Sequence, residues 1–486
     1  MAIAAAPTIN DIKTSYYTAL QSQAQSTVYG NLGITNAYSV DASVIGDFPY
    51  FWQNAGFFNQ NTWTWFNNVF QYGTNGYLDV SGDSLASELF NTYLKISYQL
   101  SASDQSTVNQ ANLNAQAQLN TVVTDWTSNF GPIPAANSAT PAAKANYVTT
   151  QVLGWGAAGL TLNQFLNSTN PGSLLPNAPM GSESLINDLK VYFATIGPAT
   201  DITNNQVSGE AQINAVRKNL SPAPATLAAG WMTTIADDGS NAIVPVLSMQ
   251  PDPGGIQNAL YPTRGGNSFS VSASVTKVDE STVSMSFGGG LSVSGAIDWF
   301  TFGVSGGASY STFSLDETIT TCDIDITYNG VTRVTPLLSV AAYDVGHGTG
   351  WWNPAAISQA VANTPPTQTG YTFSTTPAYN YGNNGTFGVL SALVISQLPV
   401  FTLKYSTSNT TEFQKTFQEQ SNWSVGFLGI ALANFHQSYY SSSYSYDQAT
   451  QTVTITMSPP QQVNSVPAID QTAYVIGANV VWPGTP

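Results

Sequence analysis

The spacing of hydrophobic residues changes about halfway along the chain. In the first part, apolar residues recur every three or four positions, as at Ile9, Ile12, Tyr16 and Leu20, which predicts an amphipathic helix. From Phe269 onward, apolar residues alternate with Ser and Thr at the period of a half-buried strand. The pattern predicts an α+β fold, with a mainly helical N-terminal half and a β-rich C-terminal half arranged as an antiparallel sandwich or an elongated hairpin.

Three further helices are predicted in the first half, at residues 84–100, 104–126 and 182–196. The last is expected to end at Gly197-Pro198, because proline cannot donate the next backbone hydrogen bond. The helix at 104–126 carries a narrow apolar seam flanked by Asn and Gln, a pattern that suits helix association within the chain or between chains. The seam consists of Val108, Ala111, Ala115, Leu119, Val122 and Trp126.

Composition divides the chain into a helical domain at 1–236, a linker at 237–267 and a Ser/Gly-rich β domain at 268–486. The linker is rich in Gly, Pro and Asp, which are turn residues. An aromatic-rich stretch at 47–79 is predicted to lie in loops of the first domain. It is either a surface for carbohydrate or for the membrane interface, or an aromatic core. The candidate surface residues are Trp52, Trp63 and Trp65.

Two stretches of the β domain, 283–326 and 413–457, share one pattern and suggest an internal repeat. Each runs from a polar strand into an apolar tip that contains Gly, then through a Ser/Tyr stretch into an alternating strand. The apolar tips are the candidate sites for membrane contact or assembly. They comprise Ile297, Trp299, Phe300 and Phe302 in the first stretch, and Phe427, Leu428, Ile430 and Leu432 in the second.

The repeated pattern has two interpretations. A transmembrane β-barrel needs long antiparallel strands that alternate apolar and small polar residues, with no charge on the lipid face. These stretches are similar in general look to hairpins of pore-forming toxins of the aerolysin and perforin types, although no family motif accompanies the pattern. Alternatively, both tips are buried turns of a soluble sandwich, and the weakly charged sheet edges favour assembly.

Charged residues make up only 8% of the 486 residues, with 11 Lys and Arg against 27 Asp and Glu, and the net charge is −16. The scattered basic residues exclude nucleic acid as a partner and argue against attraction to anionic lipid heads. The composition suits an extracellular or surface assembly protein that associates with itself. No secretory signal is recognisable at the start, and no run approaches the ~20 apolar residues of a membrane helix.

The residues needed for most catalytic chemistry are missing. Cys322 is the only cysteine, and we expect it to be buried. With His347 and His436 as the only histidines, neither a metal site nor a cofactor is predicted. The run from Gly303 to Gly307 fits the nucleophile pattern G-x-S-x-G, but a helix is not predicted after it. A hydrolase with two carboxylates from distant segments stays open.

The sequence therefore predicts a non-enzymatic, membrane-active, pore-forming-like protein that self-assembles through its β-rich half. One alternative is a structural subunit of an extracellular filament, sheath or surface lattice. A second alternative is a carbohydrate-binding or two-carboxylate glycan-active protein, for which the aromatic stretch would supply the sugar contacts.

Overall fold

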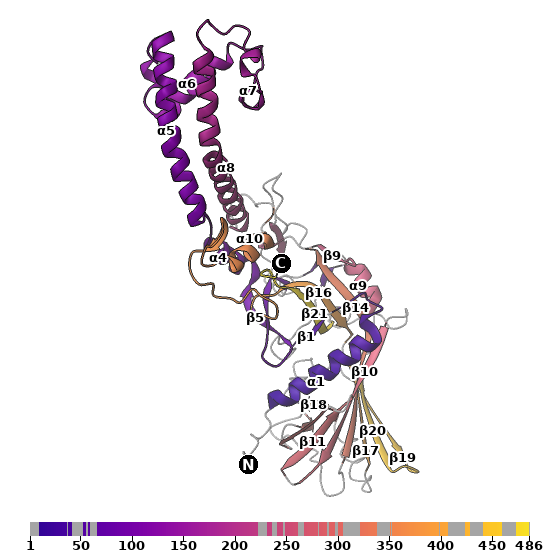
Figure 1. The fold of residues 1–486 in the computed structure, drawn as a ribbon. Helices are drawn as coiled ribbons and strands as arrows, with labels where there is room; N and C mark the ends of the chain where they lie inside the picture. Colours follow the sequence, from indigo (N-terminus) through magenta and orange to yellow (C-terminus); the bar gives the residue numbers. More distant parts are fainter. Residues whose placement is uncertain are drawn as a thin grey trace, which may run out of the picture. The chain divides into compact units, whose positions relative to one another are not determined.

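The computed structural model confirms the α+β class (Figure 1). Its helices lie mostly in the N-terminal half of the sequence, and a large antiparallel sheet is formed mostly by the C-terminal half. The structure describes residues 9–35, 37–40, 52–54, 57–58, 66–221, 231–235, 241–245, 248–260, 267–279, 281–288, 291–296, 300–304, 321–337, 350, 352–397, 399–406, 423–427, 441–458 and 473–485.

The chain divides into two compact units, and neither is one continuous stretch of sequence. Unit 1 comprises Met1–Leu94, Val216–Ser358 and Pro377–Pro486, and unit 2 comprises Lys95–Ala215 and Gln359–Thr376. These cuts fall at positions other than 237–267, whose role as a linker between folding domains stays a prediction.

Unit 2 is mainly helical, and several of its helices begin at side-chain caps. Ser101 Oγ accepts a hydrogen bond from the Asp104 amide at the start of α5, and Thr161 forms a capping box with Gln164 at the start of α7. A short β-ladder pairs β6 with β15. The elements are β6 (Ile96–Gln99), α5 (Ala102–Phe130), η2 (Ala135–Asn137), α6 (Pro141–Leu153), α7 (Leu162–Asn167), η3 (Pro171–Leu174), α8 (Glu183–Leu220) and β15 (Gly370–Phe373).

Two helix predictions in this part of the chain are wrong at their ends. The helix expected over 84–100 ends at Leu94, and Ile96–Gln99 forms a strand, because backbone pairing with the distant Gly370–Phe373 overrides the local helical spacing. The helix expected to end at Gly197-Pro198 continues to Leu220 with Pro198 inside it. Ala199, just after that proline, is buried against α5, and this packing on both sides of Pro198 favours a continued helix.

Unit 1 is built around an 11-stranded sheet that includes the order β1-β21-β16-β14-β10-β11-β12. Strand β14 also pairs with β9 and β17, and β17 continues to β20 and β19. The sheet strands are β1 (Tyr38–Ser39), β9 (Ser248–Gln250), β10 (Asn267–Lys277), β11 (Thr282–Phe287), β12 (Leu291–Ala296), β14 (Thr321–Leu337), β16 (Val389–Ser396), β17 (Val400–Ser406), β19 (Ser441–Asp447), β20 (Thr452–Ser458) and β21 (Tyr474–Val481).

Shorter elements complete unit 1. Four two-stranded ladders pair β2 with β3, β4 with β5, β7 with β8, and β13 with β18. The elements are α1 (Ile9–Ala24), the π-helix η1 (Gln25–Tyr29), β2 (Trp52–Asn54), β3 (Phe57–Phe58), β4 (Asn68–Tyr72), β5 (Leu78–Ser84), α4 (Leu85–Leu94), β7 (Trp231–Ile235), β8 (Asn241–Pro245), α9 (Pro253–Leu260), β13 (Phe300–Val304) and β18 (Trp423–Phe427). Helices α8 and α10 (Pro354–Ala362) run across the unit boundaries, at Ala215 and at Ser358.

Candidate functional site

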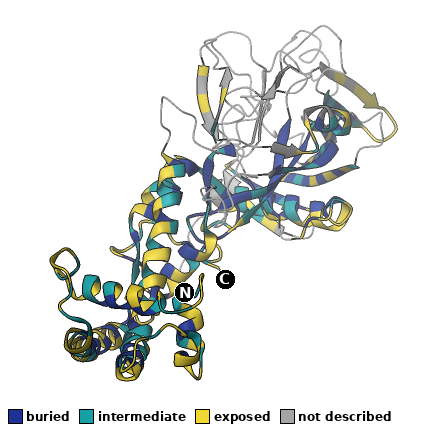
Figure 2. Cartoon of the chain, turned by 90° about the horizontal axis from the view of Figure 1, so that it is seen from above, coloured by how far each residue is buried: buried dark blue, intermediate teal, exposed yellow. Residues whose placement is uncertain are grey.

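The sheet strands predicted from period two have one apolar face and one polar face. We call the strands β12, β11, β10, β14 up to Thr327, β17, β20 and β19 the Ser/Thr sheet, and all neighbouring pairs in it are antiparallel. Buried residues alternate with half-buried or exposed ones along β10, β11, β14 up to Thr327, β17 and β20 (Figure 2), whereas the described side chains of β12 and β19 are half-buried or exposed. One register row on the polar face reads Ser292, Ser286, Ser274, Asp323, Lys404, Thr454 and Ser445.

The charged residues of the central strands belong to the polar face. Asp325 accepts a hydrogen bond from Ser272 Oγ at 2.6 Å, and its other carboxylate oxygen lies 3.3 Å from Lys404 Nζ. The side chains of Lys404 and Asp325 are 48% and 35% exposed, so this ion pair adds at most about 1 kcal/mol to stability. The apolar face at the same strands consists of Ala273, Ile324, Leu403 and Ile455, all buried.

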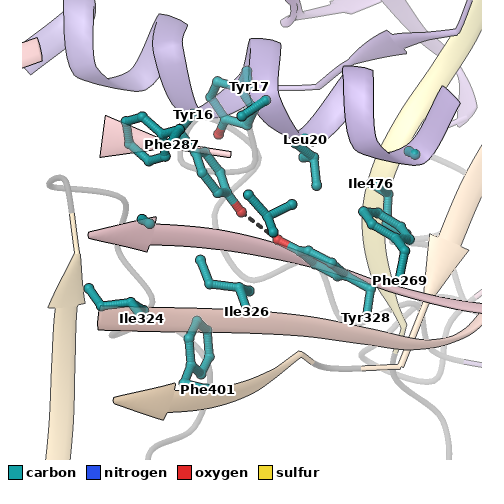
Figure 3. Close-up of a cluster of buried hydrophobic side chains, with 14 of the residues drawn as sticks. Tyr16, Tyr17, Leu20, Phe269, Phe287, Ile324, Ile326, Tyr328, Phe401 and Ile476 are labelled. Atoms are coloured by element: carbon teal, nitrogen blue, oxygen red, sulfur yellow. Dashed lines mark hydrogen bonds between the residues drawn. The ribbon is translucent and has the colours of Figure 1, made fainter. Parts of the chain in front are cut away.

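Helix α1 covers the apolar face of the Ser/Thr sheet. Tyr16, Tyr17 and Leu20 of α1 belong to the same buried cluster as Phe269 of β10 and Tyr328 of β14 (Figure 3). The hydroxyls of Tyr16 and Tyr328 are in hydrogen-bond contact, and burial raises the pKa of Tyr16 to about 12. The amphipathic helix predicted at the start of the sequence therefore packs on the first strands that were predicted from period two, β10 and β11.

The two predicted tips meet in one antiparallel ladder. Phe300 of β13 stands opposite Phe427 of β18, and Phe302 stands opposite Val425. The rest of both tips lies outside the described residues, namely Ile297, Trp299, Leu428, Ile430 and Leu432. The sequence pattern indicated two similar tips but gave no sign that they pair with each other.

The predicted seam is buried inside the chain. Val122 and Trp126 pack with Val148 of α6 and Leu185 of α8, whereas Val108 packs with Ala199 of α8. All six seam residues are buried, and the cluster partners come from the same chain. Within the described chain, seam residues therefore pack against α6 and α8, whereas a role of the seam in assembly between chains stays a prediction. The predicted seam residues are Val108, Ala111, Ala115, Leu119, Val122 and Trp126.

The aromatic-rich stretch is described only in part. Trp52 lies in β2, where its backbone stands opposite Phe58, whereas Trp63 and Trp65 lie outside the described residues. Phe66 and Phe70 are buried, with exposed fractions of 2% and 0%, and belong to an apolar cluster of unit 1. Within its described part, the stretch thus supplies core residues.

Few reactive groups gather in the described part of the chain. Groups of three or more metal-binding side chains are absent from those residues, while His347, His436 and Ser305 lie outside them. Cys322 is buried as expected, and this burial raises the pKa of its thiol to about 12, which keeps it protonated.

The structure brings together one carboxyl pair that the sequence pattern did not suggest. Asp125 of α5 and Asp188 of α8 lie close together, and burial together with the neighbouring Asp125 carboxyl raises the pKa of Asp188. The two residues are far apart in sequence, and only the packing of α5 on α8 reveals them.

Comparison with protein-family models, curated proteins and solved structures gave no match to this chain. Among the described residues, the helices are too short or too polar to cross a membrane.

Proposed function

We propose that this protein is a non-enzymatic, membrane-active protein of the pore-forming kind that acts outside the cell and assembles with itself through its β-rich half. The observation that carries the proposal is the Ser/Thr sheet, with antiparallel strands that separate buried apolar residues from hydroxyl-bearing ones. A transmembrane β-barrel needs this separation, because one face of each strand meets lipid and the other meets water. The proposal does not include nucleic acid as a partner, because the chain has only 11 Lys and Arg residues.

The arrangement of α1 supports a water-soluble state that changes on the membrane. While α1 covers Phe269, Val271 and Tyr328, their side chains are removed from water. For the apolar face of the sheet to contact lipid, α1 must move away from it. Acyl chains then take the place of the α1 side chains that covered this face. The β13–β18 ladder supports a change that involves both tips together, because their backbones are hydrogen-bonded to each other.

Leakage of a fluorescent dye from liposomes tests the proposal. The purified protein is expected to release the dye from phosphatidylcholine liposomes, and electron microscopy of the same sample is expected to show ring-like or arc-like assemblies on the vesicles. Absence of leakage across several lipid compositions and between pH 4 and 8 contradicts the proposal.

A structural subunit of an extracellular filament, sheath or lattice is the second candidate. Strand β19 favours it, because within the described residues β19 pairs only with β20 and carries exposed Ser443, Ser445 and Tyr446. Such a weakly charged edge is a template for pairing with another chain. Ordered polymers in negative stain without any lipid, together with the lack of leakage, favour this candidate over the first.

A further inference from the structure

One continuous segment of unit 2 is nearly free of charged residues, although Lys190 of α8 donates a hydrogen bond to the Ser168 carbonyl within it. Residues 126–182, which we call the apex, contain a single charged side chain, Lys144, in a chain with a net charge of −16. They comprise the end of α5, then α6, α7 and η3, up to the start of α8. Figure 1 shows α6 and α7 beside one end of the α5–α8 pair. All of these residues are described.

The apex has an aromatic interior that reaches its surface. Trp126 stacks on Trp155 with ring centres 6.3 Å apart and planes at 11°, and Phe130 lies 4.9 Å from Trp126 and 5.4 Å from Trp155. Trp126 is buried, but Phe130 and Trp155 are only partly buried. The same cluster has further half-buried apolar side chains at its rim, including Ile133, Leu160, Leu162 and Leu166.

Two loops of the apex are joined by a backbone hydrogen bond, and each carries exposed apolar residues. The amide of Asn177 donates to the Trp155 carbonyl at 3.0 Å and so joins the loop after α6 to the loop before α8. Met180 in the second loop is fully exposed, and Ala157 and Ala158 in the first are exposed too. Scattered exposed apolar residues are ordinary, but exposed apolar residues on two loops that are hydrogen-bonded to each other, in a segment with one charged side chain, mark a contact surface.

We propose that the apex is the surface with which this protein docks onto the interface of a zwitterionic lipid bilayer. The inference rests on the membrane activity proposed above and names the part that makes first contact. Trp and Tyr rings favour the boundary between acyl chains and headgroups. The exposed apolar atoms are spread over two loops. This distribution suits a lipid bilayer, which can adapt to the surface, better than a protein partner, whose binding energy comes mostly from a few residues in pockets. The many carboxylates elsewhere are strongly hydrated and disfavour close contact with lipid.

Met180→Glu tests the inference against the matched control Leu113→Glu. Both replace an exposed apolar residue of unit 2 by the same charge, since Leu113 of α5 is 69% exposed and lies outside the apex. In sedimentation with phosphatidylcholine vesicles, Met180→Glu is expected to weaken binding at least about tenfold, because transfer of one apolar side chain from water changes a binding constant by that much. Leu113→Glu is expected to bind as the unchanged protein does.

A second measurement uses an environment-sensitive dye on Met180→Cys or Leu113→Cys. Only the dye at 180 is expected to shift to the blue with vesicles, and the buried Cys322 stays unlabelled. Equal binding by Met180→Glu and the unchanged protein, or no binding by the unchanged protein, overturns the inference. So does loss of self-association in Met180→Glu with vesicle binding intact, which assigns the apex to a second copy.

The same samples separate this inference from the proposed function. Vesicle binding that depends on Met180 without any dye leakage supports docking through the apex and counts against pore formation. Leakage that Met180→Glu does not weaken, with vesicle binding also unchanged, leaves pore formation standing and removes the apex as the docking surface.

Discussion

The hydroxyl of Tyr16 in α1 is in hydrogen-bond contact with the hydroxyl of Tyr328 in β14, across 312 positions of sequence. Both rings are buried, and Tyr474 of β21 adds a further hydrogen bond to Tyr16. The contact places a polar link inside an otherwise apolar interface between α1 and the Ser/Thr sheet (Figure 3). This buried hydrogen bond favours one orientation of α1. In any other orientation, the two buried hydroxyls would lose their bonds to water without gaining a partner, which costs free energy.

Removing one hydroxyl of this pair is expected to weaken the packing of α1. Tyr16→Phe should lower the free energy of unfolding by about 1–2 kcal/mol, because Tyr328 loses a partner in a buried site. Urea denaturation of Tyr16→Phe, Tyr328→Phe and the double variant should show less than additive losses. Tyr446→Phe, at a residue 37% exposed, serves as control and should change stability by less than about 0.5 kcal/mol. Strictly additive losses contradict a shared hydrogen bond.

A disulfide across the β13–β18 ladder is expected to block leakage. Thr301 and Gly426 stand opposite each other, and the Cα separation of such pairs suits a disulfide. The variant Thr301→Cys with Gly426→Cys should lose most of its leakage activity when oxidised and regain it with a reductant. The single variant Thr301→Cys should leak equally in both conditions. Equal leakage by the oxidised and reduced double variant shows that the tips need not separate.

The seam of α5 is expected to behave as protein core. Leu119, 2% exposed, lies in the seam, and Leu113, 69% exposed, does not. Leu119→Ala should lower the free energy of unfolding by about 2–5 kcal/mol, because it leaves a cavity at a buried site. Leu113→Ala should change it by less than about 0.5 kcal/mol. A loss in Leu119→Ala that disappears at high protein concentration would instead assign the seam to an interface between chains.

The carboxyl pair of Asp125 and Asp188 predicts a pH-dependent stability. The pKa of Asp188 is raised in the folded state, so its contribution is favourable below its unfolded pKa of ~3.9 and is lost as the pH rises through the folded pKa. Asp188→Asn should therefore stabilise the protein at pH 7, by about 0.5 kcal/mol for a partly exposed pair, and less at pH 3.5. Thermal unfolding at pH 7 and at pH 3.5 measures the two stabilisations. Asp201→Asn, at an exposed residue, serves as the control. A stabilisation of equal size at both pH values argues against a charge effect.

Much of the secondary structure could be predicted because its signal is local. Period two identified Phe269–Val275 and Val283–Phe287, now within β10 and β11, and helical spacing identified the cores of α1 and α5. The prediction was wrong where distant partners decide the backbone. Ile96–Gln99 follows its ladder with β15, and α8 continues past Pro198 with Ala199 packed on α5.

The candidate sites also divide into those with a local sequence signal and those formed by distant segments. Apolar tips and a seam were visible as patterns, because side-chain spacing is written directly in the sequence. The pairing of Phe300 with Phe427, the carboxyl pair and the joined loops of the apex were not visible, because each joins segments far apart along the chain.

The sequence by itself determined the class of fold, the two faces of its alternating strands and the shortage of charge. Those properties depend on neighbouring residues and on composition. Only the tertiary structure decided that α1 covers the apolar face, that the seam packs inside the chain, and that residues 359–376 join unit 2. Hydrophobic burial is non-directional, so an apolar stripe specifies that it will be covered but leaves the covering segment to the packing of the whole chain.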